Sequence, residues 1–257
     1  MPFYTPIAPN FALTGKSIII PVVSCANVGQ LAVDLLISSL ELRVVGVFNA
    51  RYFIPVVGRR EDSEEGITTP FELYGRDGVD IVVIQQRSPA LKKLAFIEAL
   101  LDFVRSSGFA AALFLAGVDL SNRTDSQMMM PTYYVHPPNA PPLANSPLSS
   151  LSQLPLQTYT SPVFQHPHGV PDDAPIPFIP GGGLTRRILS SLPSGWPIPT
   201  AALLHFVFEG DNRADAQLLA AVASKVAKLD GQIQQWKQPT SWKQGLFGTP
   251  HDQTLYG

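Results

Sequence analysis

A run of mostly β-branched apolar residues from Ser17 to Val23 does most to restrict the fold of this chain. A run this short and this apolar is typical of a strand that is buried on both faces. Apolar residues then recur at helical spacing as far as Leu40, and Asn27 can cap the helix that they predict. Arg43 to Asn49 resembles a second strand. The opening third therefore predicts a strand–helix–strand unit.

The same alternation returns later in the chain. A strand is predicted from Asp80 to Gln86, a helix from Leu91 to Ser107 that Gly108 ends, and a strand from Ala110 to Val118. The last predicted pair is a strand from Ala201 to Phe208 and a helix from Arg213 to Leu229. Strands that alternate with helices favour an α/β fold class, with a central mostly parallel sheet flanked by helices. We expect residues 1–257 to form a single domain of this kind.

One internal segment interrupts the pattern. Between Asp125 and Asp172 there is no charged residue, whereas prolines recur among Ser, Asn and Gln. Each proline removes a backbone donor, and the apolar residues show no period. We therefore expect residues 136–172 to form an extended, mobile, proline-rich insertion. Residues 249–257 are expected to form a mobile C-terminal docking tail.

The composition excludes several classes of partner. A net charge of −2 gives no electrostatic basis for binding nucleic acid or an anionic membrane, so neither is an expected partner. No segment approaches membrane-spanning length without polar interruption, and the N-terminus does not resemble a secretory signal. Cys25 is the only cysteine, which excludes an internal disulfide framework and suits a reducing compartment. We expect a cytoplasmic location, with the nucleus as a second one.

Candidate catalytic groups are scattered along the sequence. The histidines make no recognisable metal spacing with Cys25 or nearby carboxylates, so no metal or other cofactor is expected. His205 lies inside an apolar strand and is interpreted as a structural histidine. Ser24 and Cys25 follow the first strand and could include a nucleophile, but no pattern identifies its base. Gly181 to Gly183 could bind an anion through backbone N–H groups or could form a tight turn, and the sequence leaves both open.

Several short stretches together resemble one family. They are Pro21 to Ser24 with Asn27 to Leu35, Ile179 to Thr185, Phe206 to Asn212, Ser241-Trp242, and Leu246 to Gly248. In composition and in order these stretches are similar to the proteasome assembly chaperone 2 family. The resemblance covers both ends and most of the folded chain, while the proline-rich insertion departs from the family pattern.

The resemblance implies an α/β domain related in architecture to the purine nucleoside phosphorylases but without their catalysis, and so a protein that is not an enzyme. It implies a heterodimer with proteasome assembly chaperone 1. This heterodimer would bind the outer face of the proteasome α-subunit ring, promote correct core-particle assembly and prevent off-pathway association. Leu255, Tyr256 and the Gly257 carboxylate should then enter a pocket between α subunits, with the carboxylate facing a pocket lysine.

An alternative of another class stays open at this point. A nucleoside-phosphorylase-like or other small-molecule enzyme would use the turn at Gly181 to Gly183 for an anion and a nearby polar residue for catalysis. The two hypotheses differ in what the glycine turn must do. A chaperone needs it only as a structural turn or as a loop that faces a partner.

Overall fold

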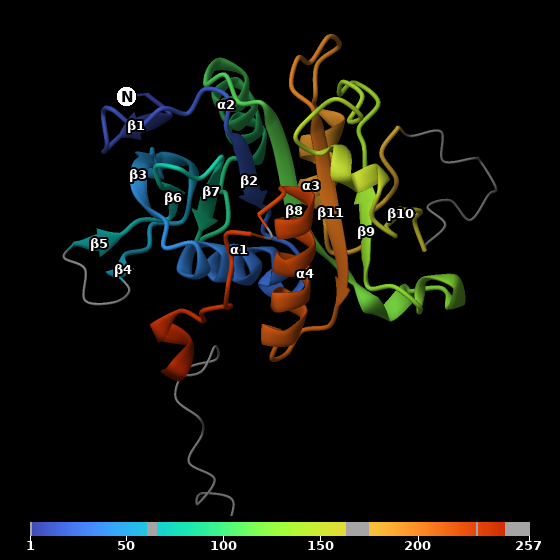
Figure 1. Ribbon diagram of the computed structural model, residues 1–257. Helices are drawn as coiled ribbons and strands as arrows, with labels where there is room; N and C mark the ends of the chain where they lie inside the picture. The colour runs from blue at the N-terminus through green and yellow to red at the C-terminus, as the bar shows by residue number, and fades with distance from the viewer. Residues whose placement is uncertain (1, 61–65, 163–174, 230, 245–257) are drawn as a thin grey trace, which may run out of the picture.

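The computed structural model describes residues 2–60, 66–162, 175–229 and 231–244. Within these ranges the chain forms a nine-stranded sheet, a separate two-stranded ribbon and four α-helices (Figure 1). The strands of the sheet are β1 (Tyr4–Pro6), β2 (Ser17–Pro21), β3 (Arg43–Phe48), β6 (Phe71–Gly75), β7 (Ile81–Gln86), β8 (Ala111–Asp119), β9 (Thr132–Val135), β10 (Gln157–Thr158) and β11 (Thr200–Val207). The ribbon pairs β4 (Gly58–Arg59) with β5 (Ile67–Thr68). The helices are α1 (Val28–Ser39), α2 (Lys93–Ser106), α3 (Gly183–Ser190) and α4 (Arg213–Val226).

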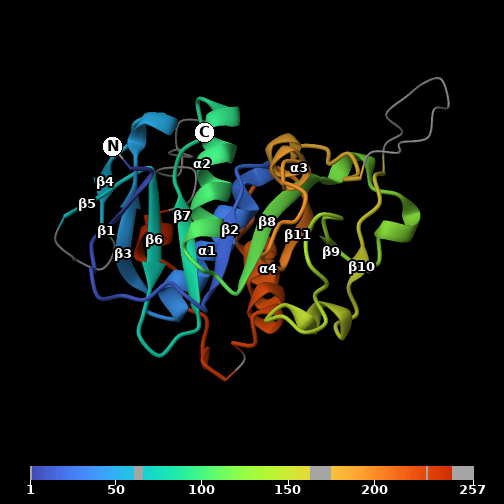
Figure 2. The ribbon, with the colours of Figure 1, turned by 90° about the horizontal axis from the view of Figure 1, so that it is seen from above.

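The sheet follows the order β1-β3-β6-β7-β2-β8-β11-β9-β10 (Figure 2). Strands β7, β2, β8 and β11 run parallel at its centre, and β6 and β9 pair antiparallel on either side of them. Every residue of β2, β7 and β11 is buried, as expected for parallel strands that are covered on both faces. The predicted α/β class, with a largely parallel central sheet flanked by helices, is therefore confirmed.

Helices cover both faces of the sheet. Helices α1 and α4 lie on one face, and α2 and α3 lie on the other (Figure 1). Side-chain alternation along β2 decides which core each residue joins, because Ile18 and Ile20 pack on the α2 side whereas Ile19 packs on the α1 side. All three are at most 1 % exposed, and burial of each such side chain contributes about 1.5–3 kcal/mol.

The opening strand–helix–strand unit forms as predicted, but its two strands are not neighbours in the sheet. Strand β2, helix α1 and strand β3 follow one another in the chain, but β6 and β7 are inserted between β2 and β3 in the sheet. Helix α2 ends at Ser106, and Gly108 turns the chain with a φ of +71°, as its position in the sequence predicts.

The proline-rich segment differs from its prediction over the part that the structure describes. In residues 136–162, β10 pairs with β9, and a short 3₁₀ turn at Ser149–Ser152 contacts α4. Leu148 and Leu151 are at most 2 % exposed and belong to the core on the face of the sheet that carries α1 and α4. The Tyr159 hydroxyl donates a hydrogen bond to the Phe178 carbonyl (3.0 Å). Scattered apolar side chains anchor this segment, and they follow no helical or strand period. Residues 163–172 lie outside the described ranges.

Candidate functional site

The carboxyl ends of the parallel strands are where an open α/β sheet usually holds a ligand. The chain leaves β2 toward one edge of the sheet through α1 and leaves β8 toward the other edge, so the switch point lies between these two strands. Ser24, Cys25 and Gly181, which the sequence singles out as catalytic candidates, all lie at this place. The sequence therefore identified the position at which an enzyme of this fold would carry its chemistry.

The chain's own backbone fills the switch point. Ala26 and Asn27 adopt left-handed conformations, with φ of 56° and 52°, in the connection between β2 and α1. A Cβ atom on Gly117 of β8 would lie 2.3 Å from the Cys25 carbonyl oxygen, so strand and connection are in direct contact. The Ser24 hydroxyl accepts a hydrogen bond from the Gly117 N–H (2.8 Å) and donates to a backbone carbonyl (2.9 Å). The Ser24 hydroxyl thus stabilises the β2–α1 connection through hydrogen bonds to the backbone, and it is not positioned as a nucleophile.

Cys25 is also unsuited to nucleophilic chemistry. Burial, followed by the charges of Glu209 and Asp119, raises the pKa of its thiol to about 11. The sulfur lies 3.5 Å from the Val207 carbonyl oxygen at the end of β11. Glu209 accepts a hydrogen bond from the N–H of Ala26 (2.8 Å) and so fixes the connection. A protonated thiol beside a carboxylate lacks the electropositive surroundings of a reactive cysteine.

The glycine turn is structural too. Gly181 has a φ of +73°, and a Cβ atom there would lie 3.1 Å from the Cys25 Cβ. The Gly182 N–H donates to the Ile179 carbonyl (2.9 Å), and a Cβ on Gly182 would lie 2.3 Å from the Ile179 side chain. The turn closes on itself and on the β2–α1 connection. Of the two interpretations that the sequence left open, the geometry supports the tight turn.

His205 is the structural histidine that the sequence predicts. It is fully buried, its Nδ1 shares a hydrogen bond with the Thr132 hydroxyl (2.8 Å), and its Nε2 faces Asp215 at 3.4 Å. The hydrogen bond with His205 lowers the pKa of the Asp215 carboxyl. Among the residues that the structure describes, no group of three or more His, Cys, Asp or Glu side chains could hold a metal ion.

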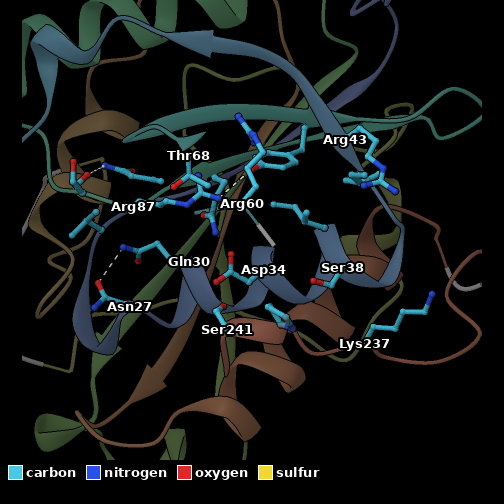
Figure 3. Close-up of a pocket in the computed structure, with 18 of the residues that line it drawn as sticks. Asn27, Gln30, Asp34, Ser38, Arg43, Arg60, Thr68, Arg87, Lys237 and Ser241 are labelled. Carbon is cyan, nitrogen blue, oxygen red and sulfur yellow. Dashed lines mark hydrogen bonds between the residues drawn. The ribbon is translucent and has the colours of Figure 1, made fainter. Parts of the chain in front are cut away.

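A polar groove lies on the α1 face of the sheet. It encloses about 590 Å³ between α1, strands β6 and β7, and the chain around Lys237 (Figure 3). Helix α1 and the residues that flank its two ends contribute a polar stripe at helical spacing, made of Asn27, Gln30, Asp34, Ser38 and Glu41. The strands and the chain next to the ribbon contribute Arg43, Arg60, Thr68, Tyr74, Gln85 and Arg87. No pattern in the sequence predicts this groove.

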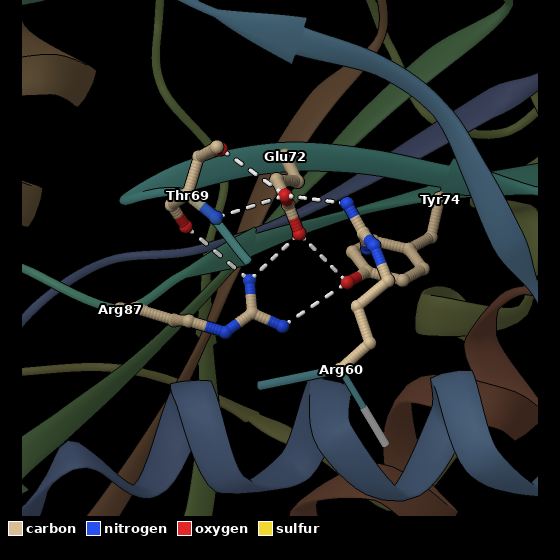
Figure 4. A network of polar contacts seen from close by, with 5 residues as sticks. All are labelled: Arg60, Thr69, Glu72, Tyr74 and Arg87. Atoms are coloured by element: carbon tan, nitrogen blue, oxygen red, sulfur yellow. Dashed lines mark hydrogen bonds and ion pairs between the residues drawn. The ribbon is translucent and has the colours of Figure 1, made fainter. Parts of the chain in front are cut away.

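A buried carboxylate fixes the inner wall of the polar groove (Figure 4). Glu72 of β6 is fully buried. Its oxygens accept hydrogen bonds from Arg60 (3.1 Å), Arg87 (2.9 Å) and the Tyr74 hydroxyl (2.8 Å). Thr69 adds its N–H (2.9 Å) and its hydroxyl (3.1 Å). Burial raises the pKa of Tyr74 to about 12, so its phenol stays a donor at neutral pH. A network in which the carboxylate is fully satisfied makes this wall rigid.

The predicted docking residues Leu255, Tyr256 and Gly257 lie outside the described residues. The described part ends in a 3₁₀ turn, Thr240–Gln244. Trp242 in this turn is 4 % exposed and packs into the core on the α1 side. The body of the protein thus fixes the chain immediately before the segment that contains the predicted docking residues.

Fold and site together define an α/β protein whose usual ligand crevice is closed by its own backbone. The PAC2 family model matches residues 18–230, and the chain belongs to the PAC2 family. Proteasome assembly chaperone 2 of Danio rerio is 32 % identical to it over 254 residues, which cover 94 % of each chain. Proteasome assembly chaperone 2 of Homo sapiens is 31 % identical over 261 residues, again 94 % of each chain. The family resemblance found in the sequence is therefore confirmed.

Two archaeal structures share the fold. PbaA of Pyrococcus furiosus, described as an archaeal homolog of proteasome-assembly chaperone, aligns with a TM-score of 0.62 and 14 % identity over 89 % of each chain. PbaB of the same organism, described as an archaeal proteasome activator, aligns with a TM-score of 0.55 and 17 % identity over 89 % of this chain and 90 % of its own. At these identities the comparison supports the architecture alone.

Family membership decides between the two hypotheses about catalysis. The curated relatives are proteasome assembly chaperones, which are not enzymes. The expectation of a non-enzymatic protein is therefore confirmed, and the relatives give no support to the alternative of a nucleoside-phosphorylase-like enzyme. In the part of the chain that the structure describes, no helix is both long enough and apolar enough to cross a membrane.

Proposed function

We propose that this protein is a proteasome assembly chaperone that pairs with proteasome assembly chaperone 1 and binds the outer face of the proteasome α-subunit ring. There it promotes correct core-particle assembly and prevents off-pathway association. The observation that carries this proposal is the match to proteasome assembly chaperone 2 of Danio rerio over 94 % of both chains. We place this activity in the cytoplasm and, as a second location, in the nucleus.

The geometry of the switch point supports a role in binding proteins. An α/β enzyme needs an open crevice at the carboxyl ends of its strands. Here Gly117 and the β2–α1 connection are in direct contact, and Glu209 is engaged by the Ala26 N–H. In the described part of the chain, the polar groove and the exposed exterior are available for contacts with other proteins.

The last three residues of the predicted docking tail have side chains and a carboxylate that suit insertion into a pocket. Leu255 can fill an apolar slot, the Tyr256 phenol can combine ring packing with a hydrogen bond, and a carboxylate on Gly257 can pair with a lysine. The thirteen residues after Gln244 can span at most roughly 45 Å in extended form. Because Trp242 is buried in the body, this reach is measured from a fixed point. A second tail on the partner would add avidity.

The test is a binding measurement on the assembled heterodimer. The chain is co-expressed with proteasome assembly chaperone 1, and the affinity of the purified pair for proteasome core particles and for isolated α-rings is measured. Deletion of Leu255 to Gly257 should weaken binding and leave pairing intact. Addition of one glycine after Gly257 should weaken binding as well, since it moves the carboxylate.

Each outcome bears on a separate part of the proposal. Binding that is unchanged after both alterations would assign recognition to the folded surface and remove the docking role of the tail. Failure of the unaltered pair to bind either particle would overturn the chaperone function itself.

A further inference from the structure

Two buried carbonyl oxygens in the polar groove have no partner. The side-chain oxygens of Gln85 on β7 and Gln30 on α1 accept no hydrogen bond from any residue that the structure describes. Gln85 is 5 % exposed and lies directly opposite Glu72 in the ladder between β6 and β7. Buried acceptors are nearly always paired, because leaving one unpaired is costly. The two walls of the groove thus both present acceptors that have no donor among the described residues.

The lining also carries an excess of positive charge. The basic residues that line the groove are Arg43, Arg60, Arg87 and Lys237, and the acidic ones are Asp34 and Glu41. Glu72 lies behind the lining and forms ion pairs with Arg60 (3.1 Å) and Arg87 (2.9 Å). Among the described residues, with Glu72 counted, the basic groups still exceed the acidic groups by one. A ligand with a single negative charge complements this surface.

An extended peptide supplies both kinds of group at once. Its backbone N–H groups are donors for Gln30 and Gln85, and one acidic side chain complements the arginines. Inorganic phosphate would meet the charge, but it offers mainly acceptor oxygens and has few O–H donors for two glutamine oxygens on opposite walls. The volume of about 590 Å³ lies within the range of roughly 300–1,000 Å³ typical of ligand sites.

We propose that the polar groove binds an extended peptide segment with one acidic side chain, and that this segment belongs to the partner subunit of the heterodimer. The inference rests on the proposed function, because it needs a partner subunit. It assigns part of the heterodimer interface to the face of α1 that carries Gln30, Asp34 and Ser38 (Figure 3).

The side chains that line the groove are preorganised by hydrogen bonds within the chain. The Glu72 network holds Arg60 and Arg87 in place, and the Gln30 amide donates to the Asn27 side chain (3.1 Å). Side chains that are already fixed lose little entropy on binding. Ser241, in the last described turn, also lines the groove (Figure 3). A bound segment would therefore lie beside the point from which the docking tail departs.

The test combines a substitution with a crosslink, both in the full chain. Gln85→Met keeps the approximate volume of the side chain and removes the acceptor. It should weaken the affinity for the partner subunit about tenfold. The midpoint of thermal unfolding of the unpaired chain should stay the same or rise, since an unpaired buried oxygen is lost. Gln217→Met, on the exposed face of α4 and outside the groove, is the matched control and should pair normally.

Two further experiments test the charge of the groove and the position of the bound segment. Arg43→Glu should weaken pairing several-fold, whereas Arg105→Glu on α2 should not. A photoreactive benzoylphenylalanine in place of Ser38 should crosslink to an acidic segment of the partner, which mass spectrometry can identify.

The possible results distinguish failure of this inference from failure of the proposed heterodimer. Normal pairing of Gln85→Met would mean that the groove holds only water and would overturn the inference while leaving the heterodimer in place. A crosslink to a segment without acidic residues, or a small molecule found in the groove by native mass spectrometry, would also overturn it. If the unsubstituted chain fails to pair at all, the proposed heterodimer and this inference both fall.

Discussion

Glu209 accepts a hydrogen bond from the N–H of Ala26 at 2.8 Å, and this bond joins the end of β11 to the connection between β2 and α1. The two residues are 183 positions apart in the chain, so the bond forms only when the sheet is assembled. The same carboxylate lies beside Cys25 and helps to raise the pKa of the thiol. The switch point of this α/β sheet is therefore closed by an internal bond at the place where related architectures admit a ligand.

Glu209→Ala should destabilise the fold modestly. The substitution leaves the Ala26 N–H without its acceptor, and a bond to a charged group contributes about 1.5–3 kcal/mol. Because Glu209 is exposed to solvent, the free energy of unfolding, measured by urea denaturation, should fall by less than this, by roughly 1 kcal/mol. Glu98→Ala, at an exposed position of α2, should leave it unchanged. Equal stability of the two variants would show that the bond does not hold the connection.

Cys25 should react with iodoacetamide only at high pH in the folded protein. Its pKa is raised from 9.0 to about 11, chiefly by burial, so the thiol is protonated at neutral pH. Because the folded pKa exceeds the unfolded value of 9.0, this contribution to stability is complete below that value and is lost as the pH rises toward 11. The labelling rate should have its midpoint near pH 11 in the folded protein and near pH 9.0 in urea. A midpoint near 9.0 in the folded protein would contradict the burial.

Glu72→Ala should be severely destabilising. It leaves Arg60 and Arg87 without the carboxylate that neutralises them, and breaking a buried ion pair typically costs about 3–5 kcal/mol. Urea denaturation should show a loss of roughly that size. Arg105→Ala breaks the exposed pair with Asp102 and should cost under about 1 kcal/mol. A loss for Glu72→Ala that is no larger than for Arg105→Ala would mean that the network does not support the wall.

The elements of the central sheet could be predicted from the sequence, but their order could not. The runs that form β2, β7, β8 and β11 are apolar enough to identify buried strands directly. Nothing in those runs specifies that the antiparallel pair β6–β7 lies between β2 and β3, because strand order depends on tertiary packing. The family resemblance, however, rested on short stretches that include the β2–α1 connection and the glycine turn, both of which the fold brings together.

The polar groove could not be predicted from the sequence, for a different reason. Glu72 lies within an apolar strand, and a charged residue there could face solvent or the interior. Only the folded chain brings Arg60 and Arg87 to it from separate segments. Gln85 is likewise an ordinary strand-end residue until the structure shows its oxygen buried and unpaired among the described residues. Burial of polar groups depends on partners that are distant in sequence, and periodicity does not report them.

Leu148→Ala tests whether the described part of the proline-rich segment belongs to the core. Leu148 is fully buried in the core on the α4 face of the sheet, so removing its side chain should leave a cavity and lower the free energy of unfolding by about 2–5 kcal/mol. Leu91→Ala, at a position that is 59 % exposed, should change it by no more than about 0.5 kcal/mol. Urea denaturation of both variants decides the point. A loss for Leu148→Ala as small as that for Leu91→Ala would restore the original expectation that this segment is an extended insertion outside the core.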